Sequence, residues 1–189
     1  MAFPDQLLEQ ARLLANLDKN RPTQASLRRA VSTAYYALFH LLTIAAVANW
    51  KTARHRADLA RAFQHGKMYE VCKTCGENSP DAKHPSFPNL QTVASNFMQL
   101  QQHRQDADYD NSKTWTRTEV RAQVELAAAA FESWNRIKGE PIAGDFLLRL
   151  LIGDKHRTRS SGAAAGKRIA SRGAERYSDS SKARKNAAR

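Results

Sequence analysis

The stretch that decides the fold is RRAVSTAYYALFHLLTIAAVANW, residues 28–50. It begins with two arginines, becomes almost wholly apolar, and carries two tyrosines and one histidine in its middle. Helices that are apolar on every side are buried on every side, so this stretch predicts the central helix of a helical bundle. Because residues four apart lie on one face of a helix, Ser32, Tyr36 and His40 are expected to form a row of polar side chains inside that bundle.

Such a polar row needs partners, because burying one unpaired polar group costs about 1–3 kcal/mol. The best candidate lies in HRQDADYD, residues 103–110. There Arg104 continues an apolar helical stripe, and Asp108 follows it by one helical turn, a spacing at which the two side chains can pair. One interpretation is therefore a polar lock between two helices, in which Arg104 pairs with Asp108 and with members of the row.

Most of residues 3–152 also show apolar side chains at helical spacing, and the whole chain has only 8 glycines and 6 prolines. The predicted fold class is all-α, an up-and-down helical bundle of about five helices plus a short sixth helix. Thr23 or Ser26 is placed to cap the second helix, and Thr116 and Glu119 have the spacing of a capping box before the fifth. The predicted helices span residues 3–17, 53–72, 88–109, 119–138 and 142–152, with a loop over 76–88, and the second helix runs from its cap at Thr23 or Ser26 to about residue 50.

The net charge is distributed unevenly along the 189 residues. Of a formal net charge of +12, residues 154–189 carry +8, from eleven Lys or Arg against three acids. This segment has almost no large apolar residue, so it cannot bury enough surface to offset the entropy of ordering. We predict a helical bundle over residues 1–153 and a disordered basic tail over residues 154–189. The tail would bind RNA or other polyanions through counterion release, or it would only keep the chain soluble.

No basic and apolar signal sequence opens the chain, and the apolar run at residues 34–50 is shorter than the ~20 residues of a membrane span. We therefore expect a cytoplasmic protein without membrane association, whose two cysteines are reduced. Cys72 and Cys75 have metal-ligand spacing and are flanked by His65 and His84, but a structural zinc site needs four ligands and usually a second pair. No metal and no cofactor are predicted, and zinc stays as an alternative.

Two stretches carry a resemblance to a known family. Residues 29–42, with their AYYALFH core, and the later grouping of Arg104, Ala107, Asp108 and Tyr109 resemble the HEPN domain, over roughly residues 3–138. The resemblance implies a homodimeric binding or regulatory module of a prokaryotic stress or defence system, with a nucleotidyltransferase-type partner protein as in toxin–antitoxin systems. It also implies a nucleotide- or RNA-binding site made of Arg104, Asp108, Tyr36, Ser32 and Arg29.

The resemblance leaves open whether the chain is an enzyme. In many HEPN proteins a histidine follows the arginine by four to six residues, and the pair forms a metal-independent ribonuclease site at a dimer cleft. Arg104 matches that arginine, but residues 109–111 are Tyr, Asp and Asn. A general base works best with a pKa near the working pH, and the phenol of Tyr109, ordinarily near ~10, is a poor substitute. A ribonuclease toxin would need a rearranged catalytic site of Arg104, His40 and Tyr109.

Overall fold

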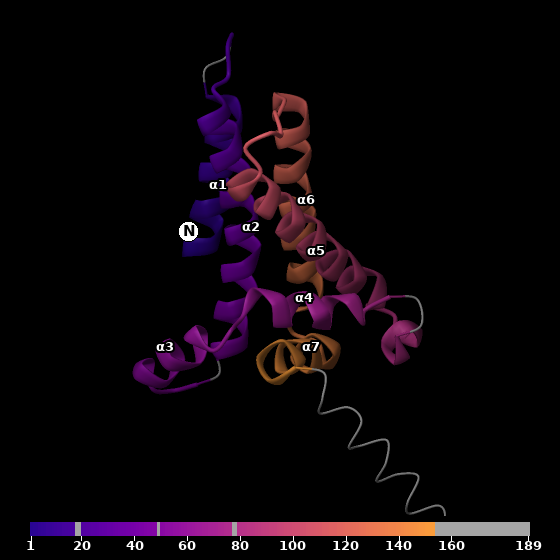
Figure 1. The fold of residues 1–189 in the computed structure, drawn as a ribbon. Coiled ribbons are helices and arrows are strands. Elements are labelled where there is room, and N and C mark those ends of the chain that lie inside the picture. Colours follow the sequence, from indigo (N-terminus) through magenta and orange to yellow (C-terminus); the bar gives the residue numbers. More distant parts are fainter. Residues whose placement is uncertain (18–19, 49, 77–78, 154–189) are drawn as a thin grey trace, which may run out of the picture. The chain divides into compact units, whose positions relative to one another are not determined.

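The structure is a computed structural model of the chain, and it describes residues 1–17, 20–48, 50–76 and 79–153. The predicted disordered tail, residues 154–189, lies outside the described residues. Within them the chain forms seven α-helices, one short 3-10 helix (η1) and no strand, which confirms the all-α bundle (Figure 1). The elements are α1 (Phe3–Asn16), α2 (Gln24–Val47), α3 (Ala53–Arg61), α4 (His65–Lys73), η1 (Pro80–Lys83), α5 (Phe87–Tyr109), α6 (Arg117–Ile137) and α7 (Pro141–Ile152).

The predicted central helix is α2. Thirteen of its 24 residues are buried, more than in any other helix that the structure describes, and it packs against α1, α5 and α6 to form the bundle (Figure 1). By length and composition it is also the one described helix that could cross a membrane, but 67% of its apolar window is buried inside the bundle. The interior of a helical bundle therefore accounts for its apolarity.

Side-chain caps fix where two of the long helices begin. The Thr23 hydroxyl accepts a hydrogen bond from the Ser26 backbone N–H at 3.2 Å at the start of α2. At the start of α6 the predicted capping box is confirmed, because the Thr116 hydroxyl accepts from the Glu119 N–H at 3.3 Å and the Glu119 carboxylate accepts from the Thr116 N–H at 2.8 Å. Each cap satisfies backbone donors that a helix leaves unpaired.

The predicted single helix over residues 53–72 is wrong. The chain forms α3, breaks at residues 62–64 and restarts as α4. No residue of α3 is buried, whereas Phe63 in the break and Met68 in α4 are. A single straight helix would hold one face inward along its whole length, so the break is what keeps α3 in solvent while α4 packs against α5 and α7.

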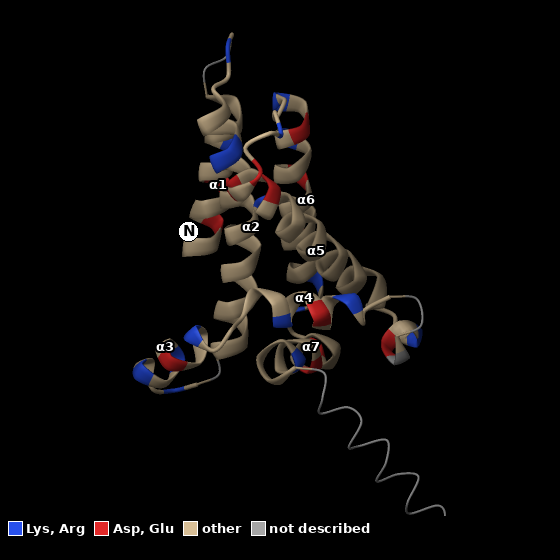
Figure 2. Cartoon of the chain, in the orientation of Figure 1, with Lys and Arg blue, Asp and Glu red and all other residues tan. Residues whose placement is uncertain are grey.

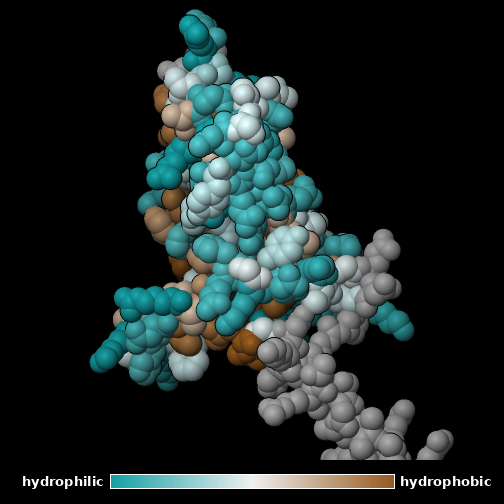
Figure 3. Space-filling view, viewed as in Figure 1, coloured by the Kyte–Doolittle hydropathy of each residue, from teal (hydrophilic) through white to brown (hydrophobic). Residues whose placement is uncertain are grey.

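The end of the bundle near α7 completes the fold. The predicted loop over residues 76–88 contains η1, and Ser79 accepts a hydrogen bond from the Asp81 N–H at the start of it. The predicted sixth helix is present as α7, which buries Phe146 and Leu150 and leaves Leu148 exposed. In the view of Figure 3 the surface over α5 and α6 is mostly hydrophilic, and hydrophobic residues show near α7 and along the edge formed by α1.

Candidate functional site

The polar row of α2 meets α5 through four side chains. Ser32 donates a hydrogen bond to Asp108 Oδ1 at 2.5 Å, Asp108 Oδ2 lies 2.7 Å from Arg104 Nε, and Arg104 Nη2 donates to the Tyr36 hydroxyl at 2.9 Å. These contacts form one continuous chain across the two helices, which we call the polar lock. The contacts that the sequence predicted for Arg104 with Asp108 and Tyr36 are therefore present.

The polar lock further favours the charged form of Arg104. Burial opposes the charge, but the hydrogen bond with Tyr36 and the negative charge of Asp108 outweigh it and raise the pKa of Arg104 above its ordinary value. The Arg104 and Asp108 side chains are 18% and 24% exposed, so this ion pair is only partly shielded from water. The cost of desolvation offsets much of the attraction in such a pair, but removal of one partner would leave the other charge partly buried and unpaired.

The other residues predicted for the site are distributed around the polar lock. Tyr109 is 70% exposed, and its ring centre lies 5.3 Å from the Arg104 guanidinium carbon. His40 packs its ring on Phe3 of α1 and makes no hydrogen bond to any described residue; burial lowers its pKa. Arg29 is exposed to solvent and takes no part in the polar lock.

The sequence did not single out His65 as a neighbour of this site. As the first residue of α4, it lies with Nδ1 2.5 Å from the buried Tyr35 hydroxyl and its ring 6.2 Å from the ring of Tyr36. Burial lowers the pKa of His65, and the positive charge of Arg104 lowers it further. Because the apolar spacing predicted one helix over residues 53–72, no signal in the sequence marked the break that places His65 here.

Arg28 was also not expected to have a role. Its guanidinium donates hydrogen bonds to three backbone carbonyls at and just beyond the C-terminal end of α5. These are the carbonyls of Ala107 at 2.8 Å, Asp110 at 2.9 Å and Lys113 at 2.6 Å. A cation at the C-terminus of a helix satisfies its unpaired carbonyls and complements the helix dipole. Arg28 thereby fixes the end of α5, where Tyr109 lies.

An open groove runs along α5 beside the polar lock, with a volume of about 670 Å³. We call it the Arg104–Tyr109 groove; its lining residues are Gln102, Arg104, Gln105, Asp106, Tyr109 and Asp110. A hydrogen bond from Lys113 lowers the pKa of Asp106, and one from Ser112 lowers that of Asp110, so both carboxylates are ionised at neutral pH. The groove therefore has no excess of positive charge of its own.

A smaller hollow of about 290 Å³ lies between α4 and α5. We call it the amide pocket; it is lined by Gly66, Tyr69 and Glu70 of α4 and by Gln101, Gln102 and Gln105 of α5. Gln102 and Gln105 line both hollows. The pocket and the groove therefore adjoin along one side of α5.

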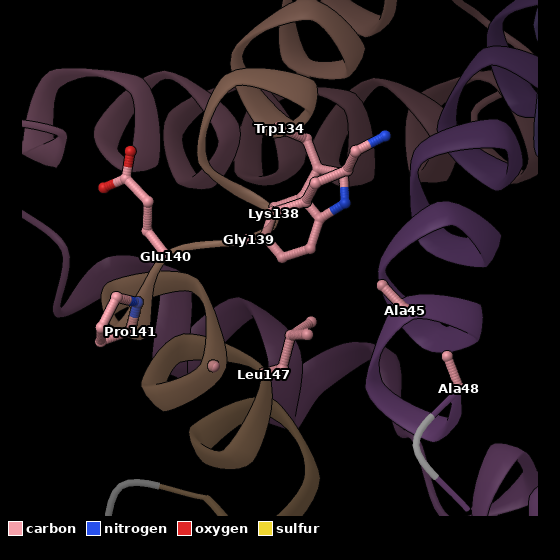
Figure 4. A pocket seen from close by; sticks show the side chains of 9 residues that line it. Ala45, Ala48, Trp134, Lys138, Gly139, Glu140, Pro141 and Leu147 are labelled. Atoms are coloured by element: carbon pink, nitrogen blue, oxygen red, sulfur yellow. The ribbon is translucent and has the colours of Figure 1, made fainter.

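A third hollow, of about 500 Å³, lies between the end of α2 and the turn from α6 to α7 (Figure 4). Its walls are largely apolar, with Ala45, Ala48 and Leu147 among them. Lys138 at its rim donates a hydrogen bond to Asn135, and the Glu140 carboxylate, which accepts one from Ser86, points away from Leu147 in Figure 4. Both charged groups thus already have partners within the domain, which makes this hollow the weakest of the three candidates.

The two cysteines lie apart from these hollows. Both are buried, and burial raises the pKa of Cys72 well above its ordinary value. Arg149 places Nη2 3.8 Å from Cys75 Sγ and 3.2 Å from Asp81 Oδ2. Of the flanking histidines, His65 contacts Tyr35, and His84 Nδ1 accepts from the Ser86 N–H at 3.2 Å. No group of three or more His, Cys, Asp or Glu in the described part of the chain is placed to hold a metal ion.

Comparison with known proteins gives no match: no family model, no curated protein and no solved structure is similar to this chain. The HEPN resemblance therefore stays a prediction from the residues that carry it.

Proposed function

We propose that this chain is a cytoplasmic HEPN-like binding module that holds single-stranded RNA at the Arg104–Tyr109 groove. One observation carries the proposal: a large aromatic ring, Tyr109, is held in solvent over a guanidinium that is itself fixed by Tyr36 and Asp108. Exposed aromatic rings and arginine planes are the surfaces on which unpaired bases stack, at about 1–3 kcal/mol per base. The homodimer, the regulatory role and the nucleotidyltransferase-type partner rest on the resemblance alone.

Binding is favoured over cleavage because the arginine lacks a base beside it. A general base must come within about 2.6–3.2 Å of the proton that it removes. No histidine among the described residues forms a hydrogen bond with Arg104, whose contacts are to Tyr36, Asp108 and the ring of Tyr109. The guanidinium acts here as a support for Tyr109.

Attraction for the RNA backbone comes from outside the groove. The chain as a whole carries +12, and Figure 2 shows cations and carboxylates interspersed over the bundle, with several cations on the exposed helix α3. Long-range positive charge raises the rate of encounter with a polyanion, and the binding it supports falls steeply with salt. Stacking in the groove would then supply the part of the affinity that salt does not remove.

The test is the affinity of a fluorescein-labelled eight-nucleotide single-stranded RNA, measured by fluorescence anisotropy at one fixed salt concentration. Tyr109→Ala should weaken binding about tenfold or more, since one stacked base is lost, while Tyr109→Phe keeps the ring and should bind like the parent. Leu148→Ala, which removes an exposed apolar side chain on α7, away from the groove, is the control. Wild-type affinity in Tyr109→Ala would overturn the proposal.

The basic tail is the main competing source of RNA binding. If the tail alone holds the RNA, deletion of residues 154–189 should abolish binding and Tyr109→Ala should leave it unchanged. If the groove holds it, the shortened chain should bind more weakly and with a shallower salt dependence, and it should still lose affinity on Tyr109→Ala.

A ribonuclease toxin remains the second candidate, for one specific reason. The ring centres of His40 and His65 lie 6.4 and 6.2 Å from that of Tyr36. The hydroxyl of Tyr36 accepts the hydrogen bond from Arg104. The lowered pKa of each histidine leaves it neutral at pH 7 and able to accept a proton. Growth arrest on expression and cleavage of RNA in vitro, both abolished by His65→Asn or His40→Asn in a folded protein, would establish the enzyme.

A further inference from the structure

We propose that the hollow between the end of α2 and the turn from α6 to α7 binds a small monocarboxylic acid with an apolar body. We call it the Trp134 hollow. It shares no lining residue with the Arg104–Tyr109 groove, so this inference does not depend on RNA binding. The hollow is a poor site for RNA, because its walls are largely apolar, but the same walls suit the hydrocarbon part of such an acid.

The inference starts from the indole ring of Trp134. This residue is 2% exposed, and its N–H makes no hydrogen bond to any described residue. The indole nitrogen of Trp115 also has no partner, but that atom is wholly enclosed by the bundle, whereas the nitrogen of Trp134 is not. In Figure 4 the Trp134 nitrogen points toward the side of the hollow that α2 forms. A buried donor without an acceptor is unfavourable, and a ligand with an acceptor oxygen would satisfy this one.

The charges around the hollow favour an anion as that ligand. Lys138 lines the hollow, and its ammonium group donates one hydrogen bond to Asn135. An ammonium group has three N–H donors, so two are left for a ligand. In Figure 4 this group also points toward the α2 side. The lining carboxylate, that of Glu140, accepts a hydrogen bond from Ser86 and points away from Leu147.

The start of α7 strengthens this preference for an anion. Gly139, Glu140 and Pro141 line the hollow at the point where this 12-residue helix begins. The N-terminus of a helix has unpaired N–H groups and a partial positive charge, which attract anions. No side chain caps α7, and its first turn contains no acidic residue. The chain therefore leaves this positive end available to the carboxylate of a ligand.

The remaining walls define the rest of the ligand. Ala45, Ala48 and Leu147 contribute only apolar side chains, and the indole ring of Trp134 adds an aromatic surface. The volume of about 500 Å³ lies within the roughly 300–1,000 Å³ that is usual for small-molecule sites. A phosphate or another anion without an apolar body would leave these walls in contact with water. The structure therefore fits a free acid with a hydrocarbon chain.

The experiment compares three probes with the same eight-carbon chain, which are octanoate, 1-octanol and octylamine. Their affinities for the full chain are measured by isothermal titration calorimetry at pH 7.5. Octanoate should bind at least about tenfold more tightly than the other two, because a charge-assisted hydrogen bond is roughly twice as strong as a neutral one.

Four variants locate the bound acid. Lys138→Met should reduce octanoate affinity to about that of 1-octanol and leave 1-octanol binding unchanged. Trp134→Phe keeps an aromatic ring without the N–H and should weaken octanoate several-fold. Gly144→Leu should block both probes by filling the hollow, since a Cβ at Gly144 meets nothing within 4 Å. Lys67→Met, the same exchange at an exposed position of α4, is the matched control and should bind like the parent.

Each other outcome overturns the inference. Equal affinity for octanoate and 1-octanol would show an apolar hollow without recognition of an acid. A preference for octanoate that survives in Lys138→Met, or octanoate binding that survives in Gly144→Leu, would place the acid elsewhere on the chain. Absence of octanoate binding at millimolar concentration would leave the hollow without this ligand. Melting temperatures confirm that each variant is folded, and if Trp134→Phe is not, the exposed position Lys138 decides.

Discussion

The polar lock and the amide pocket lie one helical turn apart on α5, and their polar groups differ in one respect. In the polar lock, Arg104 has two partners, and Asp108 is held from both sides by Arg104 and Ser32. In the amide pocket, Gln101 is more deeply buried than either and its amide has no partner among the described residues. Paired polar groups inside a bundle fix how its helices align, whereas a buried unpaired one costs free energy and adds nothing to that alignment.

The substitution expected to lower the stability of the fold most is Arg104→Ala. Removing one member of a buried ion pair costs roughly 3–5 kcal/mol, and the partial exposure of this pair puts our expectation near the lower end, about 3 kcal/mol. Asp108→Ala should cost nearly as much, because it leaves Arg104 and Ser32 without their shared partner. Denaturant unfolding of each variant measures the loss.

The double variant Arg104→Ala with Asp108→Ala decides whether the two residues act as one unit. Its loss should be well below the sum of the two single losses, since neighbours in one network are not additive. If Arg104→Ala unfolds at the same denaturant concentration as the parent, Arg104 does not align α2 with α5, and the polar lock is only a surface contact.

The next test exchanges the two buried glutamines for leucine. Gln123→Leu should destabilise the fold by about 1–2 kcal/mol, because it leaves the ring of His103 without its partner. Gln101→Leu should be neutral or slightly stabilising, because it removes a polar group that already has no partner. Thermal melts of the two variants side by side measure the difference. A loss in Gln101→Leu as large as that in Gln123→Leu would mean that Gln101 is paired in the free protein.

The polar lock could be predicted from the sequence, whereas the pocket between α4 and α5 could not, and the reason is physical. The polar lock joins two uninterrupted helices, so the spacing of Ser32 and Tyr36 on one and of Arg104 and Asp108 on the other sets which side chains face each other. The pocket and the position of His65 depend on the break at residues 62–64. That break contains Ala, Phe and Gln, with neither glycine nor proline, so burial of Phe63 sets it and local propensity does not.

A smaller effect is expected from pH, through the histidines around Tyr36. Burial lowers the pKa of His40 and His65 in the folded chain, so the unfolded chain takes up protons at a higher pH. Stability should therefore fall as the pH drops from about 7 through the ordinary value of ~6.5. Asp106, whose pKa is lowered below 3.8, loses its stabilising pair with Lys113 only in more acidic solution.

The measurement is the melting temperature at pH 7.5 and pH 5.5. We expect a fall of a few degrees in the parent chain and a smaller fall in His65→Gln, whose amide can still bond to Tyr35 but does not titrate. His55→Gln, at an exposed position on α3, is the control and should behave like the parent. A fall of equal size in the parent and in His65→Gln would show that His65 does not contribute.

The smallest expected effect is that of a chelator. It tests whether the buried cysteines Cys72 and Cys75 hold a metal ion. A structural zinc ion at Cys72 and Cys75 would contribute its binding energy to folding, so its removal would lower the melting temperature by many degrees. The described surroundings oppose such a site, because the Arg149 guanidinium lies 3.8 Å from Cys75 Sγ and a second cation there would be repelled. We expect equal melting temperatures with and without EDTA. A large drop in EDTA that added zinc reverses would show that these cysteines bind metal and that Arg149 moves aside to admit it.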